Sequence, residues 1–243
     1  MFPDGPPIPQ VYRRIFLTRG EVAISKLMPV DAIWLEQWVN DPVTTRWMST
    51  GRIQMIPETV FQQIAHWQEP RDWPFVVLLS DPAANAGFKE IGTVGLYDTD
   101  LLTRKAEFRI LLAAPYLGRG YGTEATKLAL EFGFQRLGLQ RIYLGVTDAN
   151  IGAIRCYEKC GFLREGILRR DLYRDGQFYD SIRMAILDED YRKRSEPCPT
   201  DEAKPAAILE PGPDIPQPVA EPLTGFSGGA GRFPLIGRIP PLQ

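Results

Sequence analysis

Residues 106–125 read AEFRILLAAPYLGRGYGTEA, and this stretch decides the fold. The unbroken apolar run over residues 110–114 is typical of a strand that is covered on both faces. Gly118, Gly120 and Gly122 follow at alternate positions, and glycine lets the backbone turn sharply. A helix that begins there leaves its first N–H groups unpaired, and such groups bind phosphate. The stretch therefore predicts a buried strand, a turn and a helix that together bind a nucleotide-bearing cofactor.

The composition bounds the domain organisation. The 243 residues are 44% apolar, which is enough for one domain with a buried core and a further segment. Residues 195–243 hold 11 of the 22 prolines and 6 of the 22 glycines, so this segment is expected to lack a packed fold. The sequence predicts a flexible lead-in over residues 1–10, a folded domain over 11–194 and a disordered tail over 195–243.

Charge and cysteine content narrow the classes of partner. The tail has six acidic and three basic side chains, so the whole-chain net charge of −2 minus the tail's −3 leaves +1 for the rest. That balance does not favour nucleic acid as a partner. Three cysteines, without histidine at metal-ligand spacing, indicate a reducing compartment, no disulfide and no metal. Without a long apolar run or a signal peptide, we expect a cytoplasmic protein with no membrane partner.

The first third of the chain predicts two short strands and two helices. Alternating apolar and polar residues over 12–28, broken at 18–20, predict a strand pair. Asp31 is expected to cap the first helix, and Pro57 is expected to begin the second. Their apolar positions are Trp34, Leu35 and Trp38, then Phe61, Ile64 and Trp67, with Trp47 and Met48 in the intervening loop. These side chains either pack in the core or wall an acceptor pocket, whereas His66, the single histidine, is expected to be a packing or surface residue.

The remaining chain alternates strands with one further short helix. Strands are predicted at residues 75–79, 91–97 and 141–146, and a helix over 153–159 is expected to end at Gly161. Asp175-Gly176 is a strong hairpin signal between two final strands. One strand-helix-strand unit among hairpins predicts a mixed α/β sheet.

Two motifs bear on the cofactor. Gly120, Gly122 and Ala125 match the G-x-G-x-x-A form of the dinucleotide fingerprint, with Asp148 as an acid after the next strand. That match is weak, because residues 115–117 separate the glycines from the strand and the chain has a single strand-helix-strand half. The second motif is NIGAIRCYEKCGF over residues 150–162.

The glycine turn and this second motif together resemble the GNAT superfamily of acetyl-CoA-dependent N-acetyltransferases. The resemblance covers residues 90–190 and is strongest to spermidine N-acetyltransferases, with ribosomal-protein N-terminal acetyltransferases and nucleotide-amino-sugar acetyltransferases as near relatives. It implies a single α/β domain whose central, mostly antiparallel sheet is splayed at the cofactor cleft and has helices on both faces. Family members are often dimers or larger rings, so a homo-oligomer is an expectation.

The resemblance also implies the residues that bind acetyl-CoA. The backbone N–H groups of the turn would hold the pyrophosphate, and the backbone of Leu111, Leu112 and Ala113 would pair with the pantetheine arm like an extra strand. The family often has Gln or Arg at the position of Leu117, so Arg119 is expected to supply the phosphate contact instead, and Asn150 would orient the short helix or the cofactor arm. The implied cofactor residues are Leu111, Leu112, Ala113, Leu117, Gly118, Arg119, Gly120, Tyr121, Gly122, Thr123 and Asn150.

Tyr157 matches the family's general acid, since a phenol with a pKa near 10 holds its proton at neutral pH and can pass it to a thiolate. Glu107 is the candidate base, and the alternative is a strand-end charge that pairs with Lys105 or Arg109. Cys156 and Cys160 have no adjacent base in the sequence and are expected to be inert packing residues. These assignments predict direct transfer in a ternary complex.

The leading hypothesis is an N-acetyltransferase that acts on a primary amine. A polyamine site should be rich in carboxylates, but those of residues 31–73 are scattered among tryptophans, so an amino sugar, a protein N-terminus and a small antibiotic-like amine stay open as acceptors. The competing hypothesis is a non-catalytic acyl-CoA-binding or scaffold module whose proline-rich tail recruits a partner.

Overall fold

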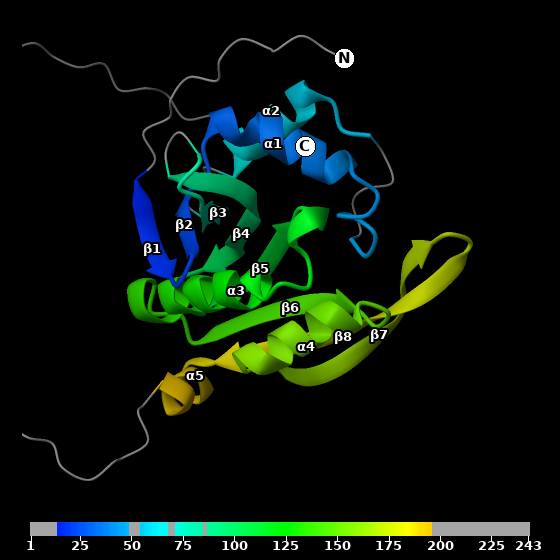
Figure 1. The fold of residues 1–243 in the computed structure, drawn as a ribbon. Coiled ribbons are helices and arrows are strands. Elements are labelled where there is room, and N and C mark those ends of the chain that lie inside the picture. The colour runs from blue at the N-terminus through cyan, green and yellow to red at the C-terminus, as the bar shows by residue number, and fades with distance from the viewer. Residues whose placement is uncertain (1–13, 49–53, 68–70, 85–86, 196–243) are drawn as a thin grey trace, which may run out of the picture. The chain divides into compact units, whose positions relative to one another are not determined.

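The computed structural model describes residues 14–48, 54–67, 71–84 and 87–195. The predicted lead-in and nearly all of the predicted tail lie outside these residues. The described part of the chain forms an eight-stranded sheet with the order β1-β2-β3-β4-β5-β6-β8-β7 (Figure 1). The strands are β1 (Ile15–Arg19), β2 (Val22–Lys26), β3 (Trp73–Ser80), β4 (Phe88–Asp100), β5 (Lys105–Leu112), β6 (Arg141–Thr147), β7 (Leu163–Arg174) and β8 (Gln177–Leu187).

The sheet is mixed, and its one parallel pair creates a fork. β5 and β6 run parallel and are joined by the long crossover that a parallel pair requires, which here contains α3 (Tyr121–Glu131). Every other neighbouring pair is antiparallel. The pairing of β5 with β6 spans only Lys105–Glu107 against Arg141–Tyr143. After Glu107, β5 stays paired with β4 and β6 stays paired with β8, so the two strands separate. The predicted mixed, mostly antiparallel sheet with a splay is confirmed.

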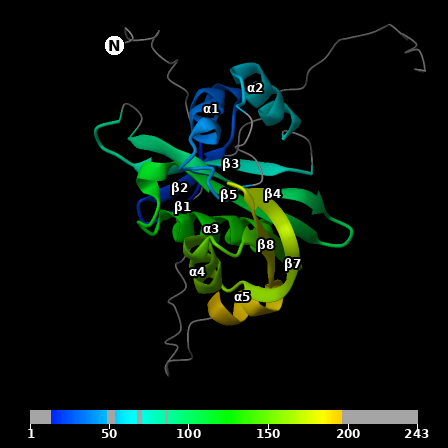
Figure 2. The same cartoon turned by 90° about the vertical axis from the view of Figure 1, so that its right-hand side faces the viewer.

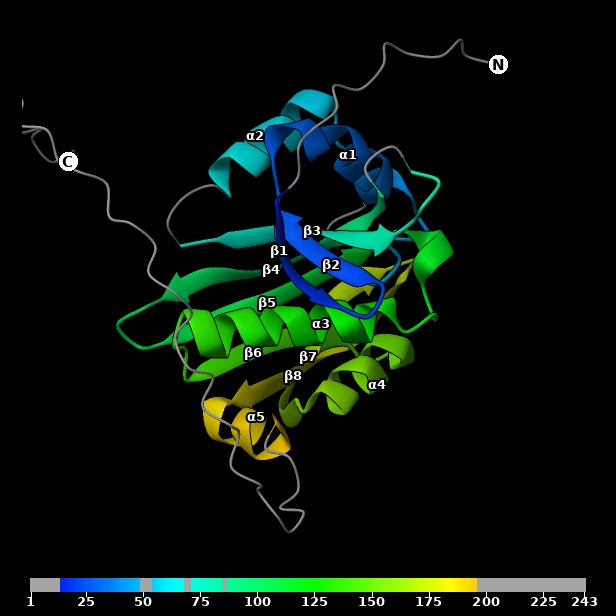
Figure 3. The ribbon, with the colours of Figure 1, turned by 60° about the vertical axis from the view of Figure 1, so that its left-hand side comes forward.

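Helices cover both faces of the sheet. α1 (Ala32–Asn40) and α2 (Pro57–His66) lie on one face, while α3 (Tyr121–Glu131), α4 (Ile151–Cys160) and α5 (Asp188–Ser195) lie on the other (Figures 2 and 3). Two buried clusters match these layers. Phe108 and Leu112 pack with α3 and α4, whereas Leu111 and Ala113 pack with α1 and α2. The central strand is therefore apolar on both sides, as the sequence predicts.

Several local predictions are confirmed. Residues 15–26 form a hairpin, and Asp175 and Gly176 both have positive φ, +50° and +84°, in the turn between β7 and β8. Gly161 ends α4 in the left-handed conformation with a φ of +103°. Within the described residues, no helix has both the length and the apolar character needed to cross a membrane.

Three local expectations differ from the structure. β5 ends at Leu112, because residues Ala114–Tyr116 form a short 3-10 turn (η2) that contains Pro115. Asp31 makes no side-chain cap on α1, since its Oδ2 accepts a hydrogen bond of 2.8 Å from the Met28 N–H instead. Phe61 is 51% exposed, and the preceding residue, Val60, occupies the buried position on α2.

Candidate active site

The glycine turn presents a row of backbone donors at the start of α3. Gly118 and Gly120 adopt positive φ values of +71° and +89°, and Gly120 is the N-cap of the helix. The N–H groups of Thr123 and Glu124 donate to the Gly120 carbonyl. Among the described residues, none accepts a hydrogen bond from the N–H groups of residues 118–122. Unpaired donors at the positive end of a helix dipole are suited to a phosphate or another anion.

The fork exposes one edge of β5. The Ala113 N–H donates to the Ile91 carbonyl oxygen at 2.9 Å, and the Leu111 carbonyl points toward Gly92. Both residues therefore direct polar backbone groups toward β4. Since these directions alternate along a strand, Ile110 and Leu112 direct their N–H and C=O groups into the fork. Beyond Glu107 no β6 residue pairs with this edge. The edge resembles a sheet position that lacks its neighbouring strand.

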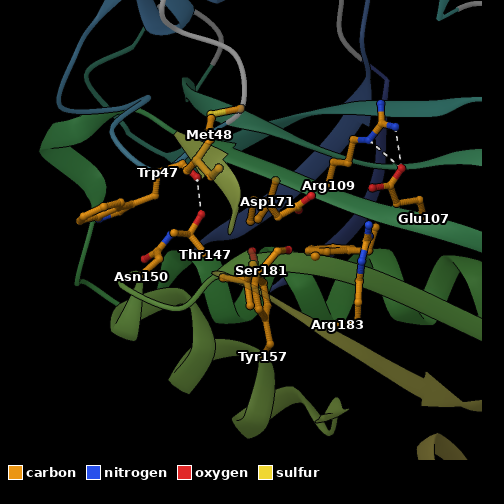
Figure 4. Close-up of a pocket in the computed structure, with 15 residues that line it drawn as sticks. Trp47, Met48, Glu107, Arg109, Thr147, Asn150, Tyr157, Asp171, Ser181 and Arg183 are labelled. Carbon is orange, nitrogen blue, oxygen red and sulfur yellow. Dashed lines mark hydrogen bonds and ion pairs between the residues drawn. The ribbon is translucent and has the colours of Figure 1, made fainter. Parts of the chain in front are cut away.

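A pocket of about 340 Å³ lies at this fork, and its volume is within the range of small-ligand sites. β5, β6 and β8 form its floor and sides, α4 contributes from below, and the loop after α1 and strand β7 close it from above (Figure 4). The lining residues are Trp47, Met48, Glu107, Phe108, Arg109, Ile110, Gly145, Val146, Thr147, Asn150, Tyr157, Asp171, Leu172, Ser181 and Arg183.

Tyr157 enters this pocket from α4. The ring packs edge-on against Phe108 at 5.8 Å between centroids and against Phe162 at 5.8 Å. Burial raises the pKa of Tyr157 above its ordinary value, because a phenolate is poorly solvated there. The hydroxyl is therefore protonated at neutral pH. Asn150, the predicted orienting residue, is the N-cap of α4 and accepts a hydrogen bond of 3.2 Å from the Ala153 N–H.

Glu107 lines the same pocket but is paired. Its Oε2 accepts hydrogen bonds from Arg109 Nη2 at 2.6 Å and Arg109 Nε at 3.2 Å. The Arg109 guanidinium also lies 4.9 Å from the Tyr97 ring centroid and 3.5 Å from an Asp98 oxygen. Glu107 therefore forms an ion pair with Arg109, which is the alternative that the sequence offers to a role as the base. Glu107 and Arg109 are two residues apart on β5 and point to the same face.

The loop over residues 41–48 is fixed to three other parts of the domain. Arg174 Nη2 donates to the carbonyls of Thr45 at 3.1 Å and Met48 at 2.7 Å. Thr147 Oγ1 donates to the Trp47 carbonyl at 3.1 Å, and Thr44 Oγ1 accepts from the Ala114 N–H at 3.0 Å. These contacts hold Trp47 and Met48 at the pocket wall.

The two helical cysteines lie beside the pocket and outside its lining. Thr123 Oγ1 is 3.4 Å from Cys156 Sγ, and Cys160 Sγ lies 3.7 Å from the Thr123 carbonyl oxygen. Hydrogen bonding from Cys160 lowers the pKa of Cys156. Neither thiol is among the residues that line the pocket, whereas the neighbouring Tyr157 is. The contacts join α4 to the first turn of α3, so the glycine turn and Tyr157 are close in space.

Sequence reasoning missed four polar residues of this pocket: Thr147, Asp171, Ser181 and Arg183. Three of them come from the final hairpin, which the sequence predicts as a pair of strands and does not connect with the site. The sequence offers no local signal for them, because their place at the pocket depends on the pairing of β8 with the side of β6 that lies away from β5.

The sequence pattern of the acetyltransferase (GNAT) domain matches residues 22–163, which is more than half of the chain. The chain belongs to the GNAT acetyltransferase family. The family prediction is confirmed, and acetyl-CoA is the acetyl donor of GNAT acetyltransferases.

Relatives of this GNAT protein include spermidine N(1)-acetyltransferases. Those of Vibrio cholerae and Escherichia coli K12 are each 39% identical to it, over 106 and 103 residues. The alignments cover 44% and 42% of this chain and 61% and 55% of those proteins, so the chain spans little more than half of its curated relatives' length. The crystal structure of the Vibrio cholerae spermidine N-acetyltransferase with CoA and spermine has a TM-score of 0.65 and 26% identity, and the match covers 72% of this chain and 99% of that one.

Proposed function

We propose that the protein is an acetyl-CoA-dependent N-acetyltransferase that acetylates a primary amine by direct attack in a ternary complex. The proposal depends on three features: the free edge of β5, the N–H groups of residues 118–122, which donate to no described residue, and Tyr157 in the pocket at the fork. Contacts of Thr123 with Cys156 and Cys160 join the start of α3 to α4, which carries Tyr157. An extended arm with a phosphate at one end and a reactive group at the other fits this arrangement.

Within this proposal, the cofactor residues divide by position. Gly118, Arg119, Gly120, Tyr121 and Gly122 hold the pyrophosphate, with Leu117 and Thr123 flanking it. Ile110 and Leu112 pair with the pantetheine arm, because their backbone groups face the fork. The expected pairing through Leu111 and Ala113 is corrected, since their backbone groups face β4. Asn150 orients α4 and thereby Tyr157.

The chemistry requires a neutral amine, stabilisation of the carbonyl oxygen and a proton for the thiolate. Acetyl-CoA supplies the acetyl group as a thioester. Glu107 accepts a proton from the amine directly or through water as the N–C bond forms. The N–H of Ile110 or Leu112 donates to the carbonyl oxygen, and Tyr157 donates its proton to the sulfur as the C–S bond breaks. The apolar surroundings that raise the pKa of Tyr157 also make a nearby thiolate more basic, which favours this transfer.

The acceptor class we favour is a polyamine, because the relatives with 39% identity are spermidine N(1)-acetyltransferases. An amino sugar and a protein N-terminus are the alternatives within the same chemistry. The test is release of CoA thiol from acetyl-CoA in the presence of a panel of these amines, with mass spectrometry of the acetylated product. Acetylation that is lost in Tyr157→Phe supports the proposal. Tight CoA binding without turnover across the panel would instead support a non-catalytic acyl-CoA-binding module.

A further inference from the structure

β7 departs from a regular ladder where it passes the pocket. Leu168 pairs with Ser181, and the next pair is Leu172 with Tyr179. Three residues of β7, 169–171, therefore lie opposite the single residue Asp180. Such a bulge bends its strand and changes the direction of its side chains.

The bulge contains a strained residue that is held in place. Arg170 has a φ of +56°, which is unfavourable for a residue with a Cβ atom. Its N–H donates to Asp180 Oδ1 at 2.8 Å, and its guanidinium lies 4.2 Å from the Phe178 ring centroid. Strained backbone persists where the surroundings enforce it, and such sites are often functional.

The residue after Arg170 is Asp171, whose side chain lines the pocket (Figure 4). Across the described part of the chain, the Asp171 side chain makes no hydrogen bond and no ion pair. Glu107, the other carboxylate of the pocket, is already bound by Arg109. Arg183 lines the pocket as well, but its guanidinium lies against Gly145 and forms no ion pair with Asp171 in the described structure. Asp171 is thus the pocket carboxylate that is available to a cation.

We infer that Asp171 determines acceptor specificity by binding a second ammonium group of the acceptor, apart from the amine that is acetylated. This inference rests on the proposed function and deepens it, because it specifies an acceptor with at least two positive charges. The reacting amine would lie at Glu107 and Tyr157, and the second ammonium would lie under β7. Amino sugars and protein N-termini with a single positive charge would not use this contact.

The inference is tested with Asp171→Asn and three acceptors: spermidine, 1,4-diaminobutane and butylamine. The last two share a carbon chain and differ by one ammonium group. Removing one charge-assisted contact is expected to raise KM for spermidine and 1,4-diaminobutane about tenfold. KM for butylamine, KM for acetyl-CoA and kcat should stay within about twofold of the wild type, because the lost contact is with the second ammonium alone. Asp171→Glu should restore part of the loss.

Asp175→Asn is the matched control. Asp175 is on the same hairpin, lies outside the pocket lining and has a φ of +50°, which asparagine tolerates. Its KM values should equal those of the wild type. Titration calorimetry of spermidine into the CoA complex measures the same contact without turnover, and Asp171→Asn should weaken binding about tenfold there too.

Three results would overturn the inference: an equal rise in KM for butylamine, no change for any acceptor, or a fall in kcat for every acceptor, which would make Asp171 a base. Failure of the proposed function has a different signature. In that case the wild type acetylates no amine, while the titration still decides whether Asp171 binds spermidine.

Discussion

At the scale of one residue, the burial of Tyr157 bears on its proposed role as the general acid. Burial raises its pKa above the ordinary value near 10, and the acid form is the one the reaction needs. Loss of activity through phenol ionisation therefore begins only when the pH rises above the raised pKa. We expect no alkaline limb of the kcat profile from this group below about pH 10. The measurement is kcat at saturating substrates from pH 6 to about 10.

Tyr157→Phe keeps the ring contacts with Phe108 and Phe162 and removes the proton donor. We expect kcat to fall about 100-fold or more, with KM for acetyl-CoA little changed. Tyr191→Phe is the control, since Tyr191 lies on α5 and its hydroxyl accepts a hydrogen bond from Gln135 away from the pocket. Equal losses in both variants would contradict the assignment of Tyr157 as the acid.

Glu107 has a natural comparison in Glu165. Both are strand glutamates that bind an arginine, Arg109 and Arg141 respectively, but only Glu107 lines the pocket. Glu107→Gln should lower kcat about 100-fold if its carboxylate accepts the amine proton. Glu165→Gln should leave kcat unchanged. Steady-state kinetics on both variants test this, and a normal kcat in Glu107→Gln would reduce Glu107 to a strand-end ion pair.

At the scale of elements, two glycines allow the cost of backbone strain to be measured apart from the effect on ligand binding. Gly120 and Gly138 have φ values of +89° and +63°, and an added Cβ would meet no atom within 4 Å at either position. Alanine at either site should therefore cost about 1 kcal/mol of unfolding free energy through backbone strain alone. Urea denaturation measures that cost.

Only Gly120 belongs to the proposed phosphate site. Gly120→Ala should also raise KM for acetyl-CoA about tenfold, because the N–H groups of the turn would change direction. Gly138→Ala should leave this KM at the wild-type value. The same rise in both variants would mean that the turn has no special relation to the cofactor.

Arg174 joins the last hairpin to the loop over residues 41–48. Arg174→Lys removes the planar donor group that reaches both Thr45 and Met48, so the loop should move more freely. KM for the amine should rise about fivefold and KM for acetyl-CoA should stay the same. Hydrogen exchange of residues 41–48 should become faster. Arg164→Lys, which alters an ion pair with Glu158 outside the pocket, is the control.

The sequence predicts most of the helices and strands but fewer of the contacts between them. The hairpin at Asp175-Gly176, the helix end at Gly161 and the turn at Gly118 follow from local conformational preference, which the residues themselves carry. The bulge at Arg170 depends on the Asp180 carboxylate on the neighbouring strand, so no local sequence pattern predicts it. For that reason the sequence predicts Tyr157 as a site residue and does not predict Asp171.

At the scale of the molecule, one departure from regular pairing organises the site. β5 is fixed by β4 and by helices on both faces, while β6 is fixed by β8, so the two strands separate without leaving the core. The apolar run over residues 110–114 predicts a doubly covered strand. The separation itself depends on strand order, which the family resemblance implied and residue patterns alone do not determine.

Truncation tests how much of the chain this site requires. All described strands and helices lie between Ile15 and Ser195, and the pocket is lined by residues between Trp47 and Arg183. A chain that ends at Ser195 should therefore keep kcat/KM for acetyl-CoA and for the best amine within about twofold, and its Tm within about 2 °C. Steady-state kinetics and calorimetry of the two chains are the measurements. A large loss of turnover with an unchanged Tm would show that residues 196–243 contribute to catalysis, whereas a lower Tm would show that they contribute to the fold.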